Sequence, residues 1–347
     1  MSNAEISQLM VDGLARVLAD FADAQTMDKI EKGETGLGHE KLIAELGFDV
    51  AMLPEDDGGA GLGWKDSVKI FELLGYYASP TDLGERIISQ WASSNAGIEV
   101  NDNTPHVGLG TVESNTDGSV TGTILVPWAS GPSLTLVEIS KQDTQEICLI
   151  DTASAASIAP ADTIGRVPSQ KVVLENCAPI QIGTLDGSFG LTHAMAFLRS
   201  SQISGAMARI LEMTIEYCNT RTQFGRPVGK FQAVQQLVAQ LAGEMAAANA
   251  AVKLAAMGMD KGRGPLEIAI AKQRASAPVA LVASIAHETH GAIGVTEEHI
   301  LHYFTRRLWQ WREEAGNEHF WAEEIGRQVV LGGGENLWPK LIGLTEG

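Results

Sequence analysis

The sequence predicts a mainly helical α+β protein in which a β region lies between two helical regions. Three observations support this order. Apolar residues recur at helical spacing before residue 103, short β-branched segments fill residues 103–187, and the helical period returns from residue 188. We therefore expect three domains, at residues 1–102, 103–187 and 188–347.

The N-terminal region is predicted to consist of amphipathic helices. The segment "ISQLMVDGLARVLADFADA" spaces Ile6, Met10, Leu14, Val17 and Phe21 at steps of three and four, which places them on one helix face. "HEKLIAELGF" and "WKDSVKIFELLGYYASP" repeat this pattern. Between them, "MLPEDDGGAGLGW" is rich in glycine and is predicted to be a loop.

The middle region is predicted to form an antiparallel sheet or a small barrel. Its segments "GSVTGTILVPWA", "LTLVEI", "QEICLIDT" and "QKVVLENC" are short, β-branched and separated by turn residues. The connections are too short to hold a crossover helix, which argues against parallel βαβ units.

Long helices are predicted again in the C-terminal region. The segment beginning "QAVQQLVAQLAGEM" places Val234, Val238, Leu241, Met245 and Ala248 on one face, and its alanines suit close helix packing. A second helical segment contains Pro278, where we expect a kink or a break.

Composition limits the class of protein. The chain has 347 residues, a net charge of −18 and no run of lysine and arginine, which argues against a nucleic-acid-binding protein. We find no apolar stretch long enough to span a membrane and no signal peptide at the N-terminus. Three widely spaced cysteines suit a reducing compartment, so a cytoplasmic location is expected.

The segment "RTQFGRPVGKFQAVQQ" at residues 221–236 interrupts two helices with glycine and proline. One interpretation is a plain turn between helices, with Phe224 in the core and Arg221 capping carbonyl groups. The other is that Arg221 presents its planar donors to a phosphate or carboxylate. The sequence pattern alone leaves both interpretations open.

Histidines are paired in "HETHGAIGVTEEHILHYF", at His287 and His290 and again at His299 and His302. A metal site in a helical bundle also needs carboxylates in register, and we find no such set here. We interpret these histidines as helix-end and interface residues and predict no metal site.

Together these segments resemble the flavin-dependent acyl-CoA dehydrogenases over nearly the whole chain. The resemblance is carried by "LPEDDGGAG", "FELLGYYASP", "VTGTILVPWAS", "EYCNTRTQFGRPVGKFQAVQQ" and "HGAIGVTEEHILHYFTRRLW". The short N-terminal region is similar to members that include small subunits of heteromeric enzymes. The resemblance implies an N-terminal helical domain, a middle antiparallel β-barrel and a C-terminal four-helix bundle.

The resemblance also implies FAD as the cofactor, bound between barrel and bundle with its adenosine end crossing a subunit interface. By that resemblance Arg221 would hold the FAD diphosphate of a neighbouring subunit, with Phe224 beside the adenosine and Gln232 nearby. Backbone at Gly291 and Gly294 would approach the same cofactor.

In the β region, the resemblance places Trp128, Ala129 and Ser130 in the loop near the flavin ring. Glu288 departs from the family, which often has glutamine at the matching position. A carboxylate at this position would repel phosphate unless a cation screened it.

The reaction implied is α,β-dehydrogenation of an acyl-CoA thioester, with a carboxylate as the base that removes the α-proton. The two positions at which family members carry that base hold Ala315 and, by spacing, about Met195. The nearest acids are Glu314 and Glu313, and we predict Glu314 as the base.

Two alternatives to an active dehydrogenase remain open from the sequence. One is a non-catalytic partner subunit of a heteromeric enzyme, and the other is an acyl-CoA oxidase. The resemblance further implies an electron-transfer flavoprotein or similar electron acceptor, a homo-oligomer or a hetero-oligomer with a homologous subunit, and a role in lipid catabolism.

Overall fold

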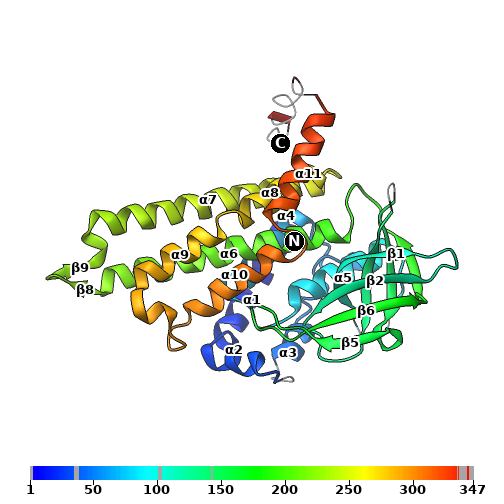
Figure 1. Ribbon diagram of the computed structural model, residues 1–347, viewed down its shortest axis with the longest axis horizontal. Helices are drawn as coiled ribbons and strands as arrows, with labels where there is room; N and C mark the ends of the chain where they lie inside the picture. Colours follow the sequence, from blue (N-terminus) through cyan, green and yellow to red (C-terminus); the bar gives the residue numbers. More distant parts are fainter. Residues whose placement is uncertain are drawn as a thin grey trace.

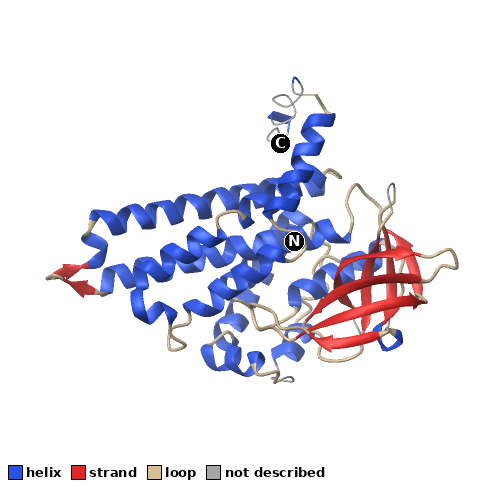
Figure 2. Cartoon of the chain, viewed as in Figure 1, coloured by secondary structure: helices blue, strands red, loops and turns tan. Residues whose placement is uncertain are grey.

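A computed structural model describes residues 3–34, 39–100, 104–141, 144–333, 335 and 342–343. Helices occupy one end and most of the length of the molecule, and the main sheet occupies the other end (Figures 1 and 2). The predicted domain boundary near residue 102 lies outside the described residues. Within those residues, no helix combines the length and apolarity that crossing a membrane requires.

The N-terminal region is helical, as predicted. Its elements are α1 (Asn3–Phe21), α2 (Ala24–Glu31), α3 (His39–Glu45), the 3-10 helix η1 (Glu55–Asp57), α4 (Trp64–Tyr76) and α5 (Leu83–Asn95). The predicted glycine-rich loop contains η1 and continues without helix or strand to the start of α4. On α1, the buried apolar residues are Leu14 and Leu18. The other apolar residues of the predicted face are half-buried.

The middle region forms a seven-stranded sheet within the described residues. Its strands are β1 (His106–Ser114), β2 (Val120–Pro127), β3 (Leu134–Ile139), β4 (Glu146–Asp151), β5 (Ser157–Pro160), β6 (Ser169–Cys177) and β7 (Gln181–Thr184), with the 3-10 helix η2 (Thr152–Ser154) after β4. The spatial order is β5-β6-β2-β1-β3-β4-β7.

Two details of this sheet correct the prediction of a fully antiparallel barrel. β1 and β3 pair in parallel, whereas the other neighbours are antiparallel. A parallel pair needs no crossover helix here because the chain passes through β2 on the way from β1 to β3. In the described part of the chain no ladder joins β5 to β7, so the sheet stays open at both edges.

The C-terminal region is a helical bundle. Its helices are α6 (Leu191–Thr220), α7 (Gln232–Asp260), α8 (Pro265–Ser276), α9 (Val279–His290), α10 (Leu301–Glu313) and α11 (Glu318–Leu331), with 3-10 helices η3 (Val228–Lys230) and η4 (Gly291–Val295). The predicted break at Pro278 is confirmed, because α8 ends and α9 begins on either side of it. α11 projects away from the other helices (Figure 1).

Helix α6 is the centre of the packing and contacts both α4 and the rest of the bundle. Two glycines allow α4 and α6 to meet backbone to backbone. A Cβ added at Gly75 would lie 1.9 Å from the carbonyl oxygen of Gln202, and one added at Gly205 would lie 1.8 Å from that of Glu72. This contact fixes the N-terminal half of α6 against α4.

The interruption at residues 221–231 is a small hairpin rather than a buried turn. β8 (Thr222–Gln223) pairs with β9 (Arg226–Pro227), and Phe224 and Gly225 form the turn with φ values of 50° and 79°. Positive φ at both central residues matches a type I′ hairpin. The prediction of Phe224 in the core is wrong, since its side chain is 90% exposed at the hairpin tip.

Candidate functional site

Two cavities lie against the sheet: one faces the N-terminal helix α2, and the other lies at the seam where the sheet meets the bundle. The first, the Ser130 cavity, has a volume of about 560 Å³ and lies between α2, the loop after β2 and the segment joining β5 to β6. The second, the Glu314 cavity, has a volume of about 570 Å³ and lies between β1 and the C-terminal end of α10. Residues 161–163 line both cavities and therefore separate them.

Buried charged residues fill the seam beside the Glu314 cavity. Arg199 on α6 places its Nε 2.6 Å from Oε2 of Glu314, and its Nη2 donates to Oε1 of Glu85 on α5 at 2.7 Å. All three side chains are 5% exposed or less. Desolvation opposes the charge of Arg199, but attraction to Glu314 and Glu85 outweighs it and raises the pKa of the guanidinium.

A second arginine joins this group, which we call the seam cluster: Glu85, Arg199, Arg307 and Glu314. The Arg307 guanidinium lies 5.1 Å from the centre of the Trp128 ring, whose Nε1 donates to Glu85 at 3.2 Å. Desolvation lowers the pKa of Arg307 to about 10, so it remains a cation near neutral pH. Two carboxylates and two guanidiniums leave the seam cluster without net charge.

Gln310 connects the seam cluster to the sheet. Its Nε2 donates to Oε1 of Glu314 at 2.6 Å, and its Oε1 accepts from the backbone N–H of Gly165 at 2.9 Å. A Cβ at position 165 would lie 2.2 Å from that Oε1, so only glycine permits this approach. One amide therefore holds both Glu314 and the segment that separates the two cavities.

The turn after α10 is fixed by unusual backbone and by a buried lysine. Ala315 has φ of 54° and Gly316 has φ of 87°, and the indole of Trp321 donates to the carbonyl of Ala315 at 2.9 Å. Lys272 on α8 donates to the carbonyls of Trp311 and Arg312, each at 2.8 Å. These contacts hold Ala315 where it lines the Glu314 cavity.

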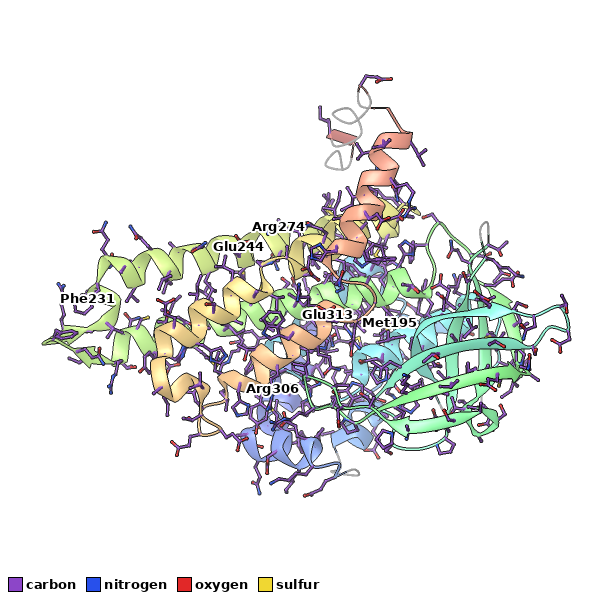
Figure 3. All side chains as sticks on the ribbon, in the orientation of Figure 1. Met195, Phe231, Glu244, Arg274, Arg306 and Glu313 are labelled. Atoms are coloured by element: carbon purple, nitrogen blue, oxygen red, sulfur yellow. The ribbon has the colours of Figure 1, made fainter. Side chains whose placement is uncertain are left out.

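The structure brings all three candidate positions for the base to the seam. Figure 3 shows Met195 and Glu313 at the junction of the bundle and the sheet. Met195 is fully buried and Ala315 lines the Glu314 cavity, but neither carries an acid. Glu314 lines the same cavity, and each of its carboxylate oxygens already contacts a protein donor, on Arg199 and on Gln310.

The predicted flavin-ring contacts divide between the cavity and the seam cluster. Ala129 and Ser130 line the Ser130 cavity, whereas the Trp128 ring packs against Arg307. Gln170 also lines this cavity, is 93% buried, and its Oε1 has no partner within the described residues. A buried acceptor of this kind needs a donor, and the ring N–H of a flavin could supply one. The lining therefore fits the cofactor that the resemblance implies.

The predicted diphosphate contacts lie far from these cavities. The β8–β9 hairpin is at the opposite end of the bundle from the sheet (Figure 1). Arg221 is exposed and forms no ion pair with the described residues, and Gln232 at the start of α7 is also exposed. Arg221 and Phe224 therefore do not share a site with Ser130 in one chain.

Gly291 and Gly294, which follow α9, have different surroundings. Gly291 is exposed with φ of 63°, and a Cβ there would meet no atom within 4 Å. Gly294 is buried, and a Cβ there would lie 2.7 Å from the Cβ of His290, so packing alone accounts for this glycine. Glu288 is exposed. In the described chain no three His, Cys, Asp or Glu side chains are placed to share a metal ion.

Sequence reasoning missed Arg199, Glu85, Lys272 and Gln310. A usable signal existed for Arg199, because it is the one Asp, Glu, Lys or Arg between Leu191 and Ala208 in a predominantly apolar helical segment. A charge buried in this way requires a partner. The identity of the partner depends on residues distant in sequence, so the pairing with Glu85 and Glu314 was not visible.

Comparisons with known proteins agree with this architecture. Residues 191–330 match the family model of the acyl-CoA dehydrogenase C-terminal domain. The acyl-CoA dehydrogenase IpdE2 of Mycolicibacterium smegmatis is 27% identical over 312 residues, which cover 88% of this chain and 92% of that protein.

Two solved structures show the same fold. The ChsE4–ChsE5 complex from Mycobacterium tuberculosis superposes with a TM-score of 0.82 at 19% identity, covering 95% of this chain and 98% of the matched chain. The FAD complex of PigA gives a TM-score of 0.74 at 18% identity, covering 96% and 99%. The family model, the relatives and the fold together show that this chain is similar to the acyl-CoA dehydrogenases, and its residues 191–330 match their C-terminal domain.

Proposed function

We propose that the chain is a cofactor-binding subunit of an FAD-dependent acyl-CoA dehydrogenase, in which a homologous chain supplies the catalytic base. The enzyme would oxidise the α,β bond of an acyl-CoA thioester to the trans-2-enoyl-CoA and pass its electrons to an electron-transfer flavoprotein or a similar acceptor. The flavin supplies the acceptor for the β-hydrogen, and this chain contributes the groups that hold it.

One observation carries the proposal: Glu314, the acid nearest to the family's base position, is already engaged. Glu314 contacts Arg199 and Gln310 through its two oxygens within a neutral, buried cluster. A base must come within hydrogen-bond distance of the α-proton, so Glu314 would first have to leave both partners. We therefore assign Glu314 to the structure of the seam in this subunit.

The charge of the Glu314 cavity supports the same conclusion. Its lining includes Asp162, Glu313 and Glu314 and, within the described residues, no lysine or arginine. Glu313 contacts Arg312 and Glu314 contacts Arg199, so these two acids are compensated, but the lining offers no cation to the phosphates of an acyl-CoA. We infer that the acyl-CoA binds the partner chain. Ser130 and the exposed Arg221 of this chain would instead contact FAD.

The exposed hairpin supports assembly with another chain. Phe224 leaves a large ring in water at the tip of the β8–β9 hairpin, and Arg221, just before β8, is an exposed cation without an ion pair among the described residues. Both side chains would be covered if the FAD of a neighbouring subunit docked there, and we infer that Gln232 and the exposed backbone at Gly291 contribute to the same contact. The similarity to a chain of the ChsE4–ChsE5 complex supports a hetero-oligomer.

A second candidate is a homo-oligomeric dehydrogenase in which Glu314 is the base. The observation in its favour is that Glu314 lines a cavity large enough for part of a substrate. For this function Arg199 would have to release the carboxylate when substrate binds.

The two candidates are separated by anaerobic titration of the FAD-reconstituted chain with a panel of acyl-CoA thioesters, monitored by flavin absorbance. We expect no bleaching by the chain alone or by Ala315→Glu, which adds a carboxylate at the family's base position but no site for the acyl-CoA. Ala315→Gln is the matched control. Bleaching by the unaltered chain that Glu314→Gln abolishes would support the second candidate, and bleaching that survives Glu314→Gln would contradict both.

A further inference from the structure

Lys272 is a buried cation that the proposed function does not use. It lies on α8 with 0% exposure. Its Nζ contacts three oxygens: the carbonyls of Trp311 and Arg312 at 2.8 Å each and the hydroxyl of Ser276 at 3.1 Å. No carboxylate is within hydrogen-bond distance of this nitrogen among the described residues.

The two carbonyls belong to the last turn of α10, where helix carbonyls have no partner within the helix. The residues that follow are Glu314, Ala315 and Gly316, which wall the Glu314 cavity. Ala315 holds a left-handed conformation, which is strained for a residue with a Cβ. The contacts of Lys272 therefore help to hold a strained turn in place.

The neutral and the charged form of Lys272 differ in how well they suit this position. A neutral amine can donate to both carbonyls and accept from the Ser276 hydroxyl, which satisfies all three contacts. An ammonium can donate to all three oxygens, but its charge is then buried without a contacting anion.

Charged groups on three packed helices act on Lys272. They are Glu313 and Glu314 at the end of α10, Glu318 on α11 and Arg199 on α6. Desolvation dominates, and it lowers the pKa of Lys272 from 10.5 to about 7, although Glu314 acts in the opposite direction. Glu314 already contacts Arg199 and Gln310, so its attraction for Lys272 is shared.

We propose that Lys272 is a proton-operated latch on the turn formed by residues 314–316, closed when the amine is neutral and opened by protonation. In the open state the α10 terminus withdraws and the ammonium reaches water. Because this turn walls the Glu314 cavity, the latch controls access to that cavity. The proposal concerns the shape of the cavity and does not depend on the reaction proposed above.

The direction of the pH effect follows from the linkage between protonation of Lys272 and opening of the turn. A group that is harder to protonate in the closed state than in water shifts the equilibrium toward the open state as protons are added. Opening is therefore favoured below about pH 7, and closure strengthens as the pH rises above it. The expected change in the opening equilibrium approaches tenfold per pH unit above about pH 7 if opening fully hydrates the amine.

Hydrogen–deuterium exchange of the intact chain tests the latch. Peptides covering residues 311–317 are compared with a reference peptide from the middle of α7 between about pH 6 and 9, after correction for intrinsic exchange. Relative protection of the turn should rise with pH in the unaltered protein. A ratio that stays constant or falls with pH would overturn the proposal, whether or not any variant folds.

Three variants sharpen this experiment. Lys272→Met removes the titrating group, so the pH dependence should vanish. Lys272→Arg places a permanent cation at the same position, so protection should be low across the whole pH range. Lys261→Met, at an exposed position after α7, is the matched control and should behave as the unaltered chain does. Retained pH dependence in Lys272→Met would assign the effect to another group.

Discussion

Arg199 and Glu314 form an ion pair of 2.6 Å in which neither side chain is more than 4% exposed. The pair joins the middle bundle helix α6 to the end of α10, directly beside a cavity at the sheet. Buried charges of this kind are costly to separate because the remaining partner is left without compensation. The integrity of the seam therefore depends on residues that also occupy the region of the expected chemistry.

Removing the Glu314 charge should destabilise the fold. We expect Glu314→Gln to lower the free energy of unfolding by about 3 kcal/mol, because Arg199 keeps only Glu85 as a counter-ion. Chemical denaturation measures this change. Glu313→Gln is the control, since Glu313 is half exposed and its loss should cost less than about 1 kcal/mol. Equal losses in the free energy of unfolding for the two variants would show that the Arg199–Glu314 pair does not stabilise the fold.

A methyl group at position 165 should disconnect the two sides of the seam. In Gly165→Ala the new Cβ would displace the Gln310 amide, which would then release Glu314 as well. We expect a loss of about 1–3 kcal/mol in the free energy of unfolding. Gly131→Ala, where a Cβ would meet no atom within 4 Å, should be close to neutral. A neutral Gly165→Ala would mean that the loop moves without cost.

The free energy of unfolding should depend on pH because Lys272 titrates. Its pKa in the folded state, about 7, lies below its ordinary value of 10.5, so the unfolded chain binds more protons between these values. The contribution of Lys272 to stability therefore increases as the pH rises from about 7 to 10.5. The difference in free energy of unfolding between the unaltered chain and Lys272→Met should grow across this window, and parallel pH profiles would refute the assignment.

The exposed hairpin tip should affect assembly and cofactor content without affecting folding. Phe224→Ser and Arg221→Lys each alter a side chain in water, so the free energy of unfolding should change by less than about 0.5 kcal/mol. We expect both variants to lose FAD or the partner chain, as measured by flavin absorbance and light scattering of the assembled enzyme. Ile180→Ser removes an exposed apolar side chain from the sheet end and is the control. Full flavin content in both hairpin variants would contradict a role for the tip.

Much of the fold followed from the sequence because periodicity is a local property. The change from helical to alternating period located the sheet, and Pro278 located the break between α8 and α9. The parallel pairing of β1 and β3 could not be predicted, since it depends on which strands become neighbours in space. The exposure of Phe224 could not be predicted either, because an apolar residue beside glycine suits both a buried turn and a hairpin tip.

The site was less accessible to sequence reasoning than the fold. The motif around Arg221 and the acids near residue 314 could be found by resemblance, yet their roles depend on contacts across the chain. Glu85 and Arg199 meet from α5 and α6, 114 positions apart. A sequence pattern can show that a buried arginine needs a partner, but it does not show which carboxylate the fold brings to it.

Helix α6 runs without interruption from the seam to the hairpin, so it mechanically couples the two ends of the molecule. Arg199 and Arg221 are separated by a rod of about 33 Å at 1.5 Å per residue. A tilt of about 5° at the anchored end would therefore swing the tip through about 3 Å. A neighbouring chain that docks at the hairpin would in this way strain the Arg199–Glu314 salt bridge at the seam.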